Sequence, residues 1–226
     1  SENALNTHIA HDIGAKEVAT HIAKLLECPL VMSNFSRLLI DSNRGIDDPT
    51  LIMKISDGKI IEGNKNISFL NDCKEKKKRI NNYYNIYHNK ISEIISRSLK
   101  KNIFPAIISI HSFTPSFGGN KRSTELGILW DSDSRLPDIF FSYLNKNYKH
   151  ISVSNNKPYS GRMKNDSLYR HGTKQGLANI LLEIRQDLII DSAKQKEFSK
   201  LIAKPLLENK SNDNLFKKKF YKSLAK

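Results

Sequence analysis

Residues 104–110 read FPAIISI and residues 177–184 read LANILLEI, and these two apolar stretches decide the fold class. Each is short and almost continuously apolar, which is typical of a strand that is covered on both faces of a sheet. Residues 15–26 (AKEVATHIAKLL) instead repeat their apolar side chains at helical spacing, and Pro29 follows closely. Helices that alternate with short buried strands predict an α/β fold.

Further elements follow from the same patterns. Residues 35–41 (FSRLLID) predict a loop that enters another buried strand. Residues 51–71 are polar and punctuated by Gly58 and Gly63, which predicts a surface excursion. The other expected elements are a strand at 126–130 and helices at 72–100, 137–148 and 191–207.

The length of 226 residues suits one sizeable domain with a buried core. We expect a single domain over residues 1–208 and a basic tail over residues 209–226. The only cysteines, Cys28 and Cys73, cannot form a disulfide framework, and no apolar run approaches the roughly 18 residues of a membrane helix. These features favour a soluble protein of the cytoplasm without a membrane partner.

The chain is strongly basic, with 37 Lys and Arg against 23 Asp and Glu and a formal net charge of +14. Such a field attracts nucleic acid, anionic lipid or a small acidic substrate, and it does not choose among them. Much of the excess lies in residues 74–79 (KEKKKR) and in the lysines of the tail. We expect both clusters to be solvated surface, with a phosphate-binding patch as the alternative.

Each of the two apolar stretches contains or precedes a polar side chain that is unusual in a hydrophobic core. His111 follows residues 104–110, and open α/β sheets build ligand sites at the carboxyl ends of their strands. Glu183 lies within an apolar run, where an unpaired charge is very costly and a raised pKa would suit a general base. The structural alternatives are a core histidine bonded to backbone and an ion pair of Glu183 with Arg185 or another arginine.

Residues 7–15 (THIAHDIGA) bring His8, His11 and Asp12 together at the start of the first helix. A carboxylate beside imidazoles can form one corner of a metal site, and a site with an open position suits catalytic zinc. The alternative is a pair of His8 with Asp12, one helical turn apart.

Arg37 and Arg44 lie on either side of the apolar run LLI. The planar guanidinium suits bidentate recognition of a carboxylate. The alternative is a structural pair with Asp41 or Asp47, which would hold the loop. Residues 157–162 (KPYSGR) predict a tight turn that borders the same cleft.

Seven segments of the chain resemble the N-formylglutamate amidohydrolase family, in the order in which that family carries them, over roughly Asn6 to Leu206. Each motif is modest alone, whereas seven in the right order are specific. The segments are THIAHDIGA (7–15), FSRLLIDSNR (35–44), SDGKIIEGN (56–64), SIHSFTP (109–115), KPYSG (157–161), LYRH (168–171) and LLEIRQDLI (181–189).

The resemblance implies a three-layer α/β fold, a mixed sheet with helices on both faces, related to zinc carboxypeptidases. It implies a zinc-dependent hydrolase of an N-acyl amide, with N-formylglutamate giving formate and glutamate as the type reaction. The expected substrate is therefore a small anionic N-acyl amino acid, in agreement with the positive charge of the chain.

The resemblance also implies roles for individual residues. His111 resembles a metal ligand, Asp12 resembles a second one, and Glu183 resembles the general base that activates a metal-bound water. The residues implied to bind substrate carboxylates are Arg37, Arg44, Tyr159 and Arg185.

One motif of the family is absent from this sequence. Members usually carry a glutamate-histidine-alanine motif on their first strand, and its histidine is expected to complete the metal site. The sequence begins at Ser1, in the middle of the family's pattern, so we expect it to be a portion of a longer protein. A non-catalytic family member is the alternative if the whole protein lacks the motif.

A basic binding protein is the competing class. It would bind nucleic acid through residues 74–79 and the tail, with a steep salt dependence and no need for His111 or Glu183. This reading leaves the polar groups of the two buried strands without an explanation, so the hydrolase is favoured. The oligomeric state does not follow from the sequence.

Overall fold

A mixed sheet of four strands forms the centre of the molecule. The computed structural model describes residue 5 and residues 7–70 and 73–226. β8 pairs in parallel with β3 and antiparallel with β6, and β6 pairs in parallel with β7. In sheet order the strands are β3 (Ile107–Phe113), β8 (Asn179–Arg185), β6 (Leu126–Leu129) and β7 (Val153–Asn155).

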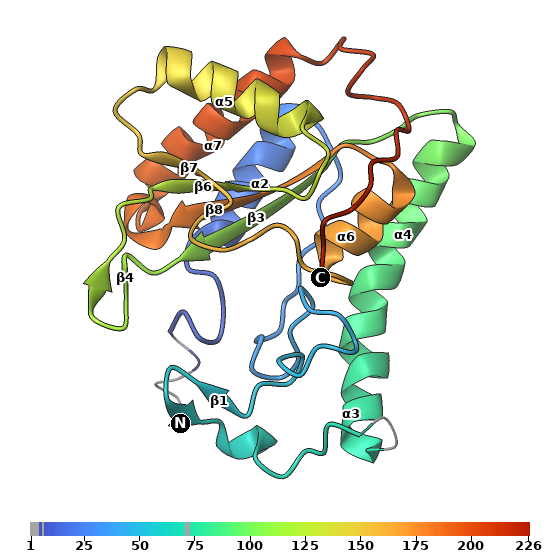
Figure 1. Cartoon of the computed structure of the whole chain (residues 1–226), viewed down its shortest axis with the longest axis vertical. Helices are drawn as coiled ribbons and strands as arrows, with labels where there is room; N and C mark the ends of the chain where they lie inside the picture. Colours follow the sequence, from blue (N-terminus) through green and yellow to red (C-terminus); the bar gives the residue numbers. More distant parts are fainter. Residues whose placement is uncertain (1–4, 6, 71–72) are drawn as a thin grey trace.

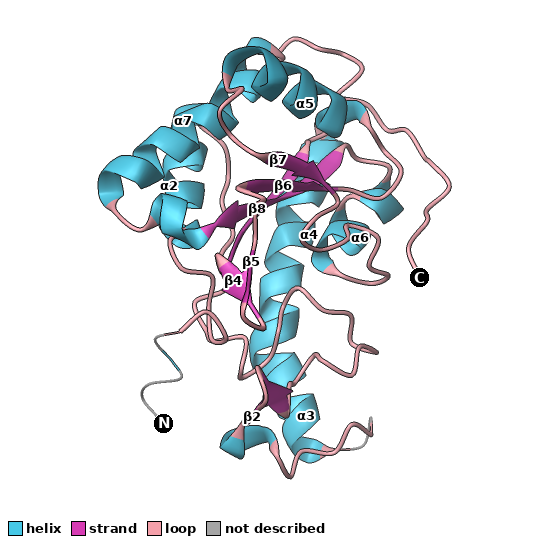
Figure 2. Ribbon diagram, turned by 60° about the vertical axis from the view of Figure 1, so that its left-hand side comes forward, coloured by secondary structure: helices cyan, strands magenta, loops and turns pink. Residues whose placement is uncertain are grey.

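Helices cover both faces of this sheet (Figures 1 and 2). One layer contains α2 (Ala15–Leu26), α5 (Arg135–Asn147) and α7 (Ser192–Glu208). The other contains α4 (Asn85–Lys100) and α6 (Ser167–His171). The main core lies between the sheet and the first layer, where Val18, Phe140 and Ile202 meet the strand residues Ile128 and Ile180. The α/β arrangement that the sequence predicts is therefore present.

Several expected elements are confirmed, one with the same bounds and the others with shifted bounds. The helix at 15–26 is α2, and the expected strand at 126–130 and helices at 137–148 and 191–207 are β6, α5 and α7. β3 begins three residues later than expected, so His111 lies within the strand instead of after it. β7 and α6 were not expected, since three and five residues are too few for a periodic pattern.

A small lobe, residues 35–70 and 73–84, extends away from the sheet (Figure 1). It contains the hairpin of β1 (Ile55–Ser56) and β2 (Lys59–Ile60) and the turn η1 (Glu62–Asn64). Its apolar side chains form a cluster apart from the main core, and this cluster comprises Ile40, Leu51, Ile52, Ile67 and Tyr84.

Residues 35–41 form turns, so the strand expected there is wrong. The amide of Asp41 donates to the carbonyl of Leu51 at 2.8 Å, within the small lobe. The apolar run is buried without joining a sheet, because Leu38 and Ile40 enter two different small clusters.

Residues 51–70 are only in part the surface excursion that we expected at 51–71, of which Asn71 lies outside the described residues. The hairpin residues Ile55 and Ile60 are exposed, whereas Leu51 and Ile67 are buried. Short apolar stretches between glycines thus suffice here to build the core of the small lobe.

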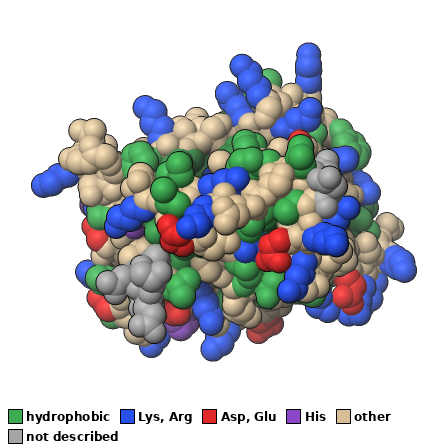
Figure 3. Space-filling view, turned by 90° about the horizontal axis from the view of Figure 1, so that it is seen from below, with side chains coloured by type: hydrophobic (Ala, Val, Ile, Leu, Met, Phe, Trp, Pro, Cys, Tyr) green, Lys and Arg blue, Asp and Glu red, His purple; other side chains and the backbone are tan. Residues whose placement is uncertain are grey.

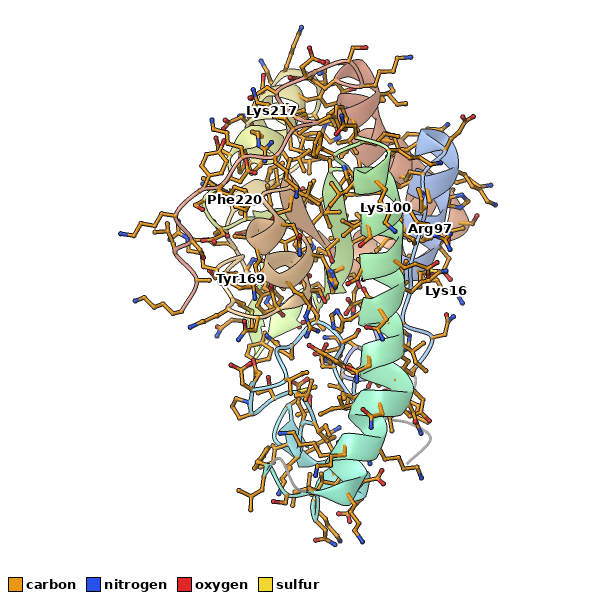
Figure 4. All side chains as sticks on the ribbon, turned by 90° about the vertical axis from the view of Figure 1, so that its right-hand side faces the viewer. Lys16, Arg97, Lys100, Tyr169, Lys217 and Phe220 are labelled. Carbon is orange, nitrogen blue, oxygen red and sulfur yellow. The ribbon has the colours of Figure 1, made fainter. Side chains whose placement is uncertain are left out.

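One long helix joins the small lobe to the sheet. α3 (Lys74–Arg79), the π-helical turn η2 (Ile80–Tyr84) and α4 follow one another without a break. This confirms the helix expected at 72–100, of which Asp72 lies outside the described residues. Figure 4 shows the helix along the length of the molecule, with Arg97 and Lys100 toward its upper end.

Two buried contacts fix this helix to its surroundings. The hydroxyl of Tyr84 donates to the carbonyl of Arg44 at 2.7 Å. One turn later, His88 Nδ1 lies 2.8 Å from Nε2 of His171 in α6. Burial lowers the pKa of His88 to about 3 and that of His171 to about 4, so both rings are neutral near pH 7 and one donates to the other.

The basic run 74–79 is not the fully solvated cluster that we expected. Lys76 and Arg79 are buried, with exposed fractions of 9% and 8%. The Arg79 guanidinium donates to the carbonyl of Leu39 at 2.8 Å and to the side-chain oxygen of Asn64 at 2.7 Å. It therefore fastens the helix to the small lobe.

The tail, residues 209–226, lies along the sheet domain with its lysine side chains exposed. Arg135 Nη1 donates to the carbonyl of Lys217 at 2.7 Å, and the amide of Lys219 donates to the carbonyl of Gly176 at 2.8 Å. The tail is thus held through its backbone.

The basic side chains are spread over the molecule. Figure 4 places Lys217 and Phe220 of the tail on the opposite side from Lys16 and Arg97. On the face shown in Figure 3, Lys and Arg are interspersed with acidic and apolar side chains. Among the described helices, none has the length and apolar character needed to cross a bilayer.

Replacing Arg79 by Met should destabilise the protein, because buried acceptors lose their donor. We expect the free energy of unfolding, measured by urea denaturation, to fall by about 2–4 kcal/mol, at roughly 1–3 kcal/mol per unsatisfied group. Lys78→Met removes the same formal charge from an exposed position of the same run and should change it by less than about 0.5 kcal/mol. Equal stabilities of the two variants would contradict the fastening role of Arg79.

Candidate active site

His111 and Glu183 lie side by side on neighbouring strands. The register of β3 and β8 pairs His111 with Glu183, and the register of β6 and β8 pairs Glu183 with Gly127. Side chains of paired residues project from the same face of a sheet, so the imidazole and the carboxyl group share one face. Strand pairing therefore brings together the two polar groups that stand apart in the sequence.

Gly127 leaves room beside Glu183 for the turn at 157–162. A Cβ atom at Gly127 would lie 2.3 Å from the carbonyl oxygen of Lys157 and 3.3 Å from the Cβ of Glu183. Any side chain at this position would displace the turn. The segment that begins at Lys157 thus packs against Gly127, the neighbour of Glu183 in the sheet.

Glu183 is 8% exposed, and its Oε2 atom has no hydrogen-bond partner among the described residues. Burial raises the pKa of Glu183, against the opposing effect of positive charges such as Arg37 and Arg122. The alternative ion pair with Arg185 does not form, because Arg185 pairs with Asp187 at 2.8 Å. A buried carboxyl group with a free oxygen and a raised pKa is suited to accept a proton.

His111 is held between two hydrogen-bonding neighbours. Its Nδ1 lies 2.7 Å from Oδ2 of Asp12, and its Nε2 lies 3.0 Å from the hydroxyl of Ser109. Because a carboxylate only accepts, the neutral ring carries its proton on Nδ1 and accepts from Ser109 at Nε2. Burial lowers the pKa of His111, with Glu183 opposing. The second oxygen of Asp12 accepts from the guanidinium of Arg37.

Asp12 reaches the site from the segment before α2. Ser112 of β3 donates to the carbonyl of Ile13 at 2.8 Å, which holds this segment against the strand. The alternative pair of His8 with Asp12 does not form, since His8 lies 2.7 Å from Asp57. His11 is exposed and lines the same cavity as Asp12 and His111.

The predicted carboxylate-binding arginines are engaged within the protein. Arg37 pairs with Asp12, and Arg44 lies 3.7 Å from Asp41, the structural pair that the sequence left as an alternative. Arg185 contacts two carboxylates and thereby holds the end of β8. Whether these arginines bind substrate stays a prediction.

Two further residues belong to the site and were missed by the sequence analysis. Arg122 donates to the hydroxyl of the predicted residue Tyr159 at 3.1 Å. Asp166 is buried, accepts from the amide of Tyr169 at 2.7 Å, and caps α6; burial raises its pKa to about 6. The N-cap pattern Asp-Ser could have indicated Asp166, whereas no spacing indicated Arg122.

A cavity of about 740 Å³ lies in front of β3. Its polar lining includes Asp12, Arg37, Ser109 and His111. This volume is within the range of sites for small molecules.

The donors at this site do not complete a metal centre. Within the described residues, no three His, Cys, Asp or Glu side chains are grouped so that they could hold an ion. Asp12 and His111 meet, as the metal prediction requires, but they bond to each other and Asp12 also binds Arg37. They supply at most two of the three protein ligands usual for catalytic zinc.

Comparison with known proteins identifies the family. Residues 1–190 match the N-formylglutamate amidohydrolase family. Since the match spans more than half of the sequence, the chain belongs to this family, as its motifs predicted. No curated protein matches the chain.

Two solved structures are similar to this one. The gene product Atu2144 from Agrobacterium tumefaciens has a TM-score of 0.86 and 31% sequence identity, over 95% of this chain and 83% of its own. An N-formylglutamate amidohydrolase from Ralstonia eutropha JMP134 has a TM-score of 0.49 and 18% identity, over 78% of this chain and 76% of its own. The first likeness extends the shared fold over almost the whole chain.

The pKa of Glu183 makes stability depend on pH. The folded protein holds this proton more tightly than the unfolded chain, so stability falls as the pH rises from the ordinary glutamate pKa of about 4.3 through the raised value. Glu183→Gln removes this titration and should gain stability relative to the unmodified protein between about pH 4 and about pH 8. Urea unfolding at both pH values measures the difference.

The exposed Glu197→Gln serves as the control and should show no such trend. A Glu183→Gln effect of the same size at both pH values would show that the carboxyl group is not perturbed.

Proposed function

We propose that this protein hydrolyses the N-acyl amide bond of N-formylglutamate or of a related small acidic N-acyl amino acid. Membership of the amidohydrolase family supports a hydrolase. The observation that carries the proposal is the buried carboxyl group of Glu183, with one oxygen free of partners, beside the neutral ring of His111.

Glu183 is the proposed general base. It takes a proton from a water molecule as the water oxygen attacks the formyl carbon. The protonated carboxyl group then gives this proton to the amide nitrogen as the C–N bond breaks. Formic acid and glutamate leave, the acid ionises, and Glu183 is a carboxylate again. A pKa raised above that of an exposed glutamate suits both proton transfers.

The neighbours of Glu183 are proposed to orient His111 and to polarise the substrate carbonyl. Asp12 fixes the tautomer and the plane of His111, so Nε2 of the ring is left to accept a hydrogen bond. Arg37, Arg44 and Arg122 act on Glu183 as positive charges. The same charges favour an anionic substrate and the oxyanion that forms on its carbonyl.

Zinc dependence and a relation to zinc carboxypeptidases stay predictions from the resemblance of the motifs. A bound zinc ion would polarise the acyl carbonyl, and Asp12 and His111 are the residues proposed to hold it. Since the described donors do not complete a centre, none of the steps above uses a metal. Location in the cytoplasm and the nucleic-acid alternative also stay predictions.

Release of formate from N-formyl-L-glutamate tests the proposal. Protein expressed from its complete reading frame should release formate, and Glu183→Gln should lower kcat by about 10²–10⁴-fold, the usual contribution of a general base. Glu125→Gln, a second glutamate of the same sheet region that pairs with Arg185, is the control and should retain most of the activity. Equal activities of the two variants would remove Glu183 from the mechanism.

Ser109→Ala separates water activation from nucleophilic catalysis. Ser109, His111 and Asp12 are hydrogen-bonded in series, an order that also occurs in serine hydrolases. If Glu183 activates water, Ser109→Ala should change kcat by less than about tenfold, and no acyl-enzyme should be trapped by rapid quenching. A loss of about 10³-fold or more would instead identify Ser109 as the nucleophile.

Chelation tests the metal prediction. If zinc acts in the complete protein, incubation with 1,10-phenanthroline abolishes formate release and added zinc restores it. His111→Ala should reduce the zinc content measured by mass spectrometry, a readout that does not depend on activity. Full activity in metal-free protein would show that the metal prediction is wrong while leaving the role of Glu183 intact.

A further inference from the structure

Arg122 differs from the other arginines that act on Glu183. Arg37 and Arg44 each pair with an aspartate. Arg122 forms no ion pair with any of the residues that the structure describes. Its positive charge is therefore not neutralised by the protein, although the side chain is half-buried.

Aromatic rings keep the Arg122 guanidinium in place. Its Cζ lies 5.5 Å from the ring centroid of Phe113, 5.0 Å from that of Phe117 and 5.3 Å from that of Tyr159. These are cation–π distances, which fix a cation without cancelling its charge. The Arg122 amide also donates to the carbonyl of Pro115 at 2.8 Å, so the backbone is held as well.

One edge of the guanidinium is left without acceptors. Nη1 donates to the hydroxyl of Tyr159 at 3.1 Å and approaches the carbonyl of Thr114 at 3.5 Å. For Nε and Nη2, the structure shows no acceptor among the described residues. These two nitrogens form the edge that binds a carboxylate through two parallel hydrogen bonds.

The rings and the arginine lie where a substrate could reach them. Phe113 is the last residue of β3, two positions after His111. The hairpin of β4 (Ser116–Phe117) and β5 (Asn120–Lys121) projects from this end of the sheet (Figure 1). Phe117 and Tyr159 are exposed by 58% and 44%, so the rings line an open edge.

We propose that Arg122 and Tyr159 form the subsite that binds one carboxylate of the acidic substrate. This assignment rests on the proposed hydrolysis and names the residues that recognise one charge of the proposed substrate. Arg122 takes the role that the motifs suggested for Arg185, whose guanidinium is occupied by Asp187 and Glu125.

Substrates that each lack one charge test the subsite. N-formyl-L-glutamine lacks the side-chain carboxylate, and N-formyl-4-aminobutyrate lacks the other one. Arg122→Gln should raise KM for N-formyl-L-glutamate by about 10- to 100-fold, as expected for a charge-assisted bidentate contact, and should lower kcat by a smaller factor. The same increase should appear for the analogue that retains the bound carboxylate and be absent for the other analogue.

Lys121→Gln is the matched control, because it removes the same charge from the exposed neighbouring position. It should leave all three KM values within about twofold. Equal increases of KM for all three substrates in Arg122→Gln, or an equal effect of Lys121→Gln, would overturn the proposal. Thermal unfolding of both variants shows whether a change in KM comes from misfolding.

Calorimetric binding of glutarate provides a readout without turnover. Wild-type protein should bind this dianion, and Arg122→Gln should weaken binding by about tenfold or more. If wild-type protein releases no formate but binds glutarate through Arg122, the proposed hydrolysis fails and the subsite stands. If formate is released and Arg122→Gln binds glutarate normally, only the subsite fails. Absence of both activities in wild-type protein overturns both proposals.

Discussion

A carboxyl group buried in the central strand of a sheet imposes conditions on every neighbour. Glu183 is costly to ionise in this position, and among the described residues no cation pairs with it directly. The protein offers it instead a neutral imidazole on one side, a glycine on the other, and arginines at a greater distance. A slip of one residue in either ladder would turn Glu183 to the opposite face of the sheet. The two strand registers therefore determine the positions of the site side chains as well as the fold.

The arginines of the site divide the work of charge compensation and recognition. Those that pair with aspartates or glutamates organise loops: Arg37 orients Asp12, and Arg185 fastens the end of β8. Arg122 is held by aromatic rings, so it is ordered and still fully charged. A cation held in this way can bind an anion without first releasing a carboxylate of the protein.

Sequence reasoning reached the strands and the central pair for physical reasons. An apolar run interrupted by one charged residue is unusual enough to point to Glu183, and parallel strand ends made His111 its natural companion. The sequence analysis did not predict the turns at 35–41, because an apolar run buried in two small clusters has the same sequence pattern as one buried in a sheet. The burial of Arg79 was also not predicted, because a run of basic residues is typical of exposed surface. Arg122 is defined by rings from three separate segments, and no local pattern carries that information.

The long helix bears on how the cavity receives its ligand. Tyr84 bonds the helix to the backbone of Arg44, and His88 bonds it to α6. The same helix therefore contacts both the loop that contains Arg44 and the helix layer of the sheet. Movement of the Arg44 loop relative to α6 would require the long helix to bend or these two hydrogen bonds to break. The part of the cavity wall that the helix provides through Tyr87 is thus set before any ligand arrives, and little conformational entropy is lost there on binding. Selectivity in such a site comes from rejecting molecules of the wrong shape at the entrance, with little reshaping of the protein around them.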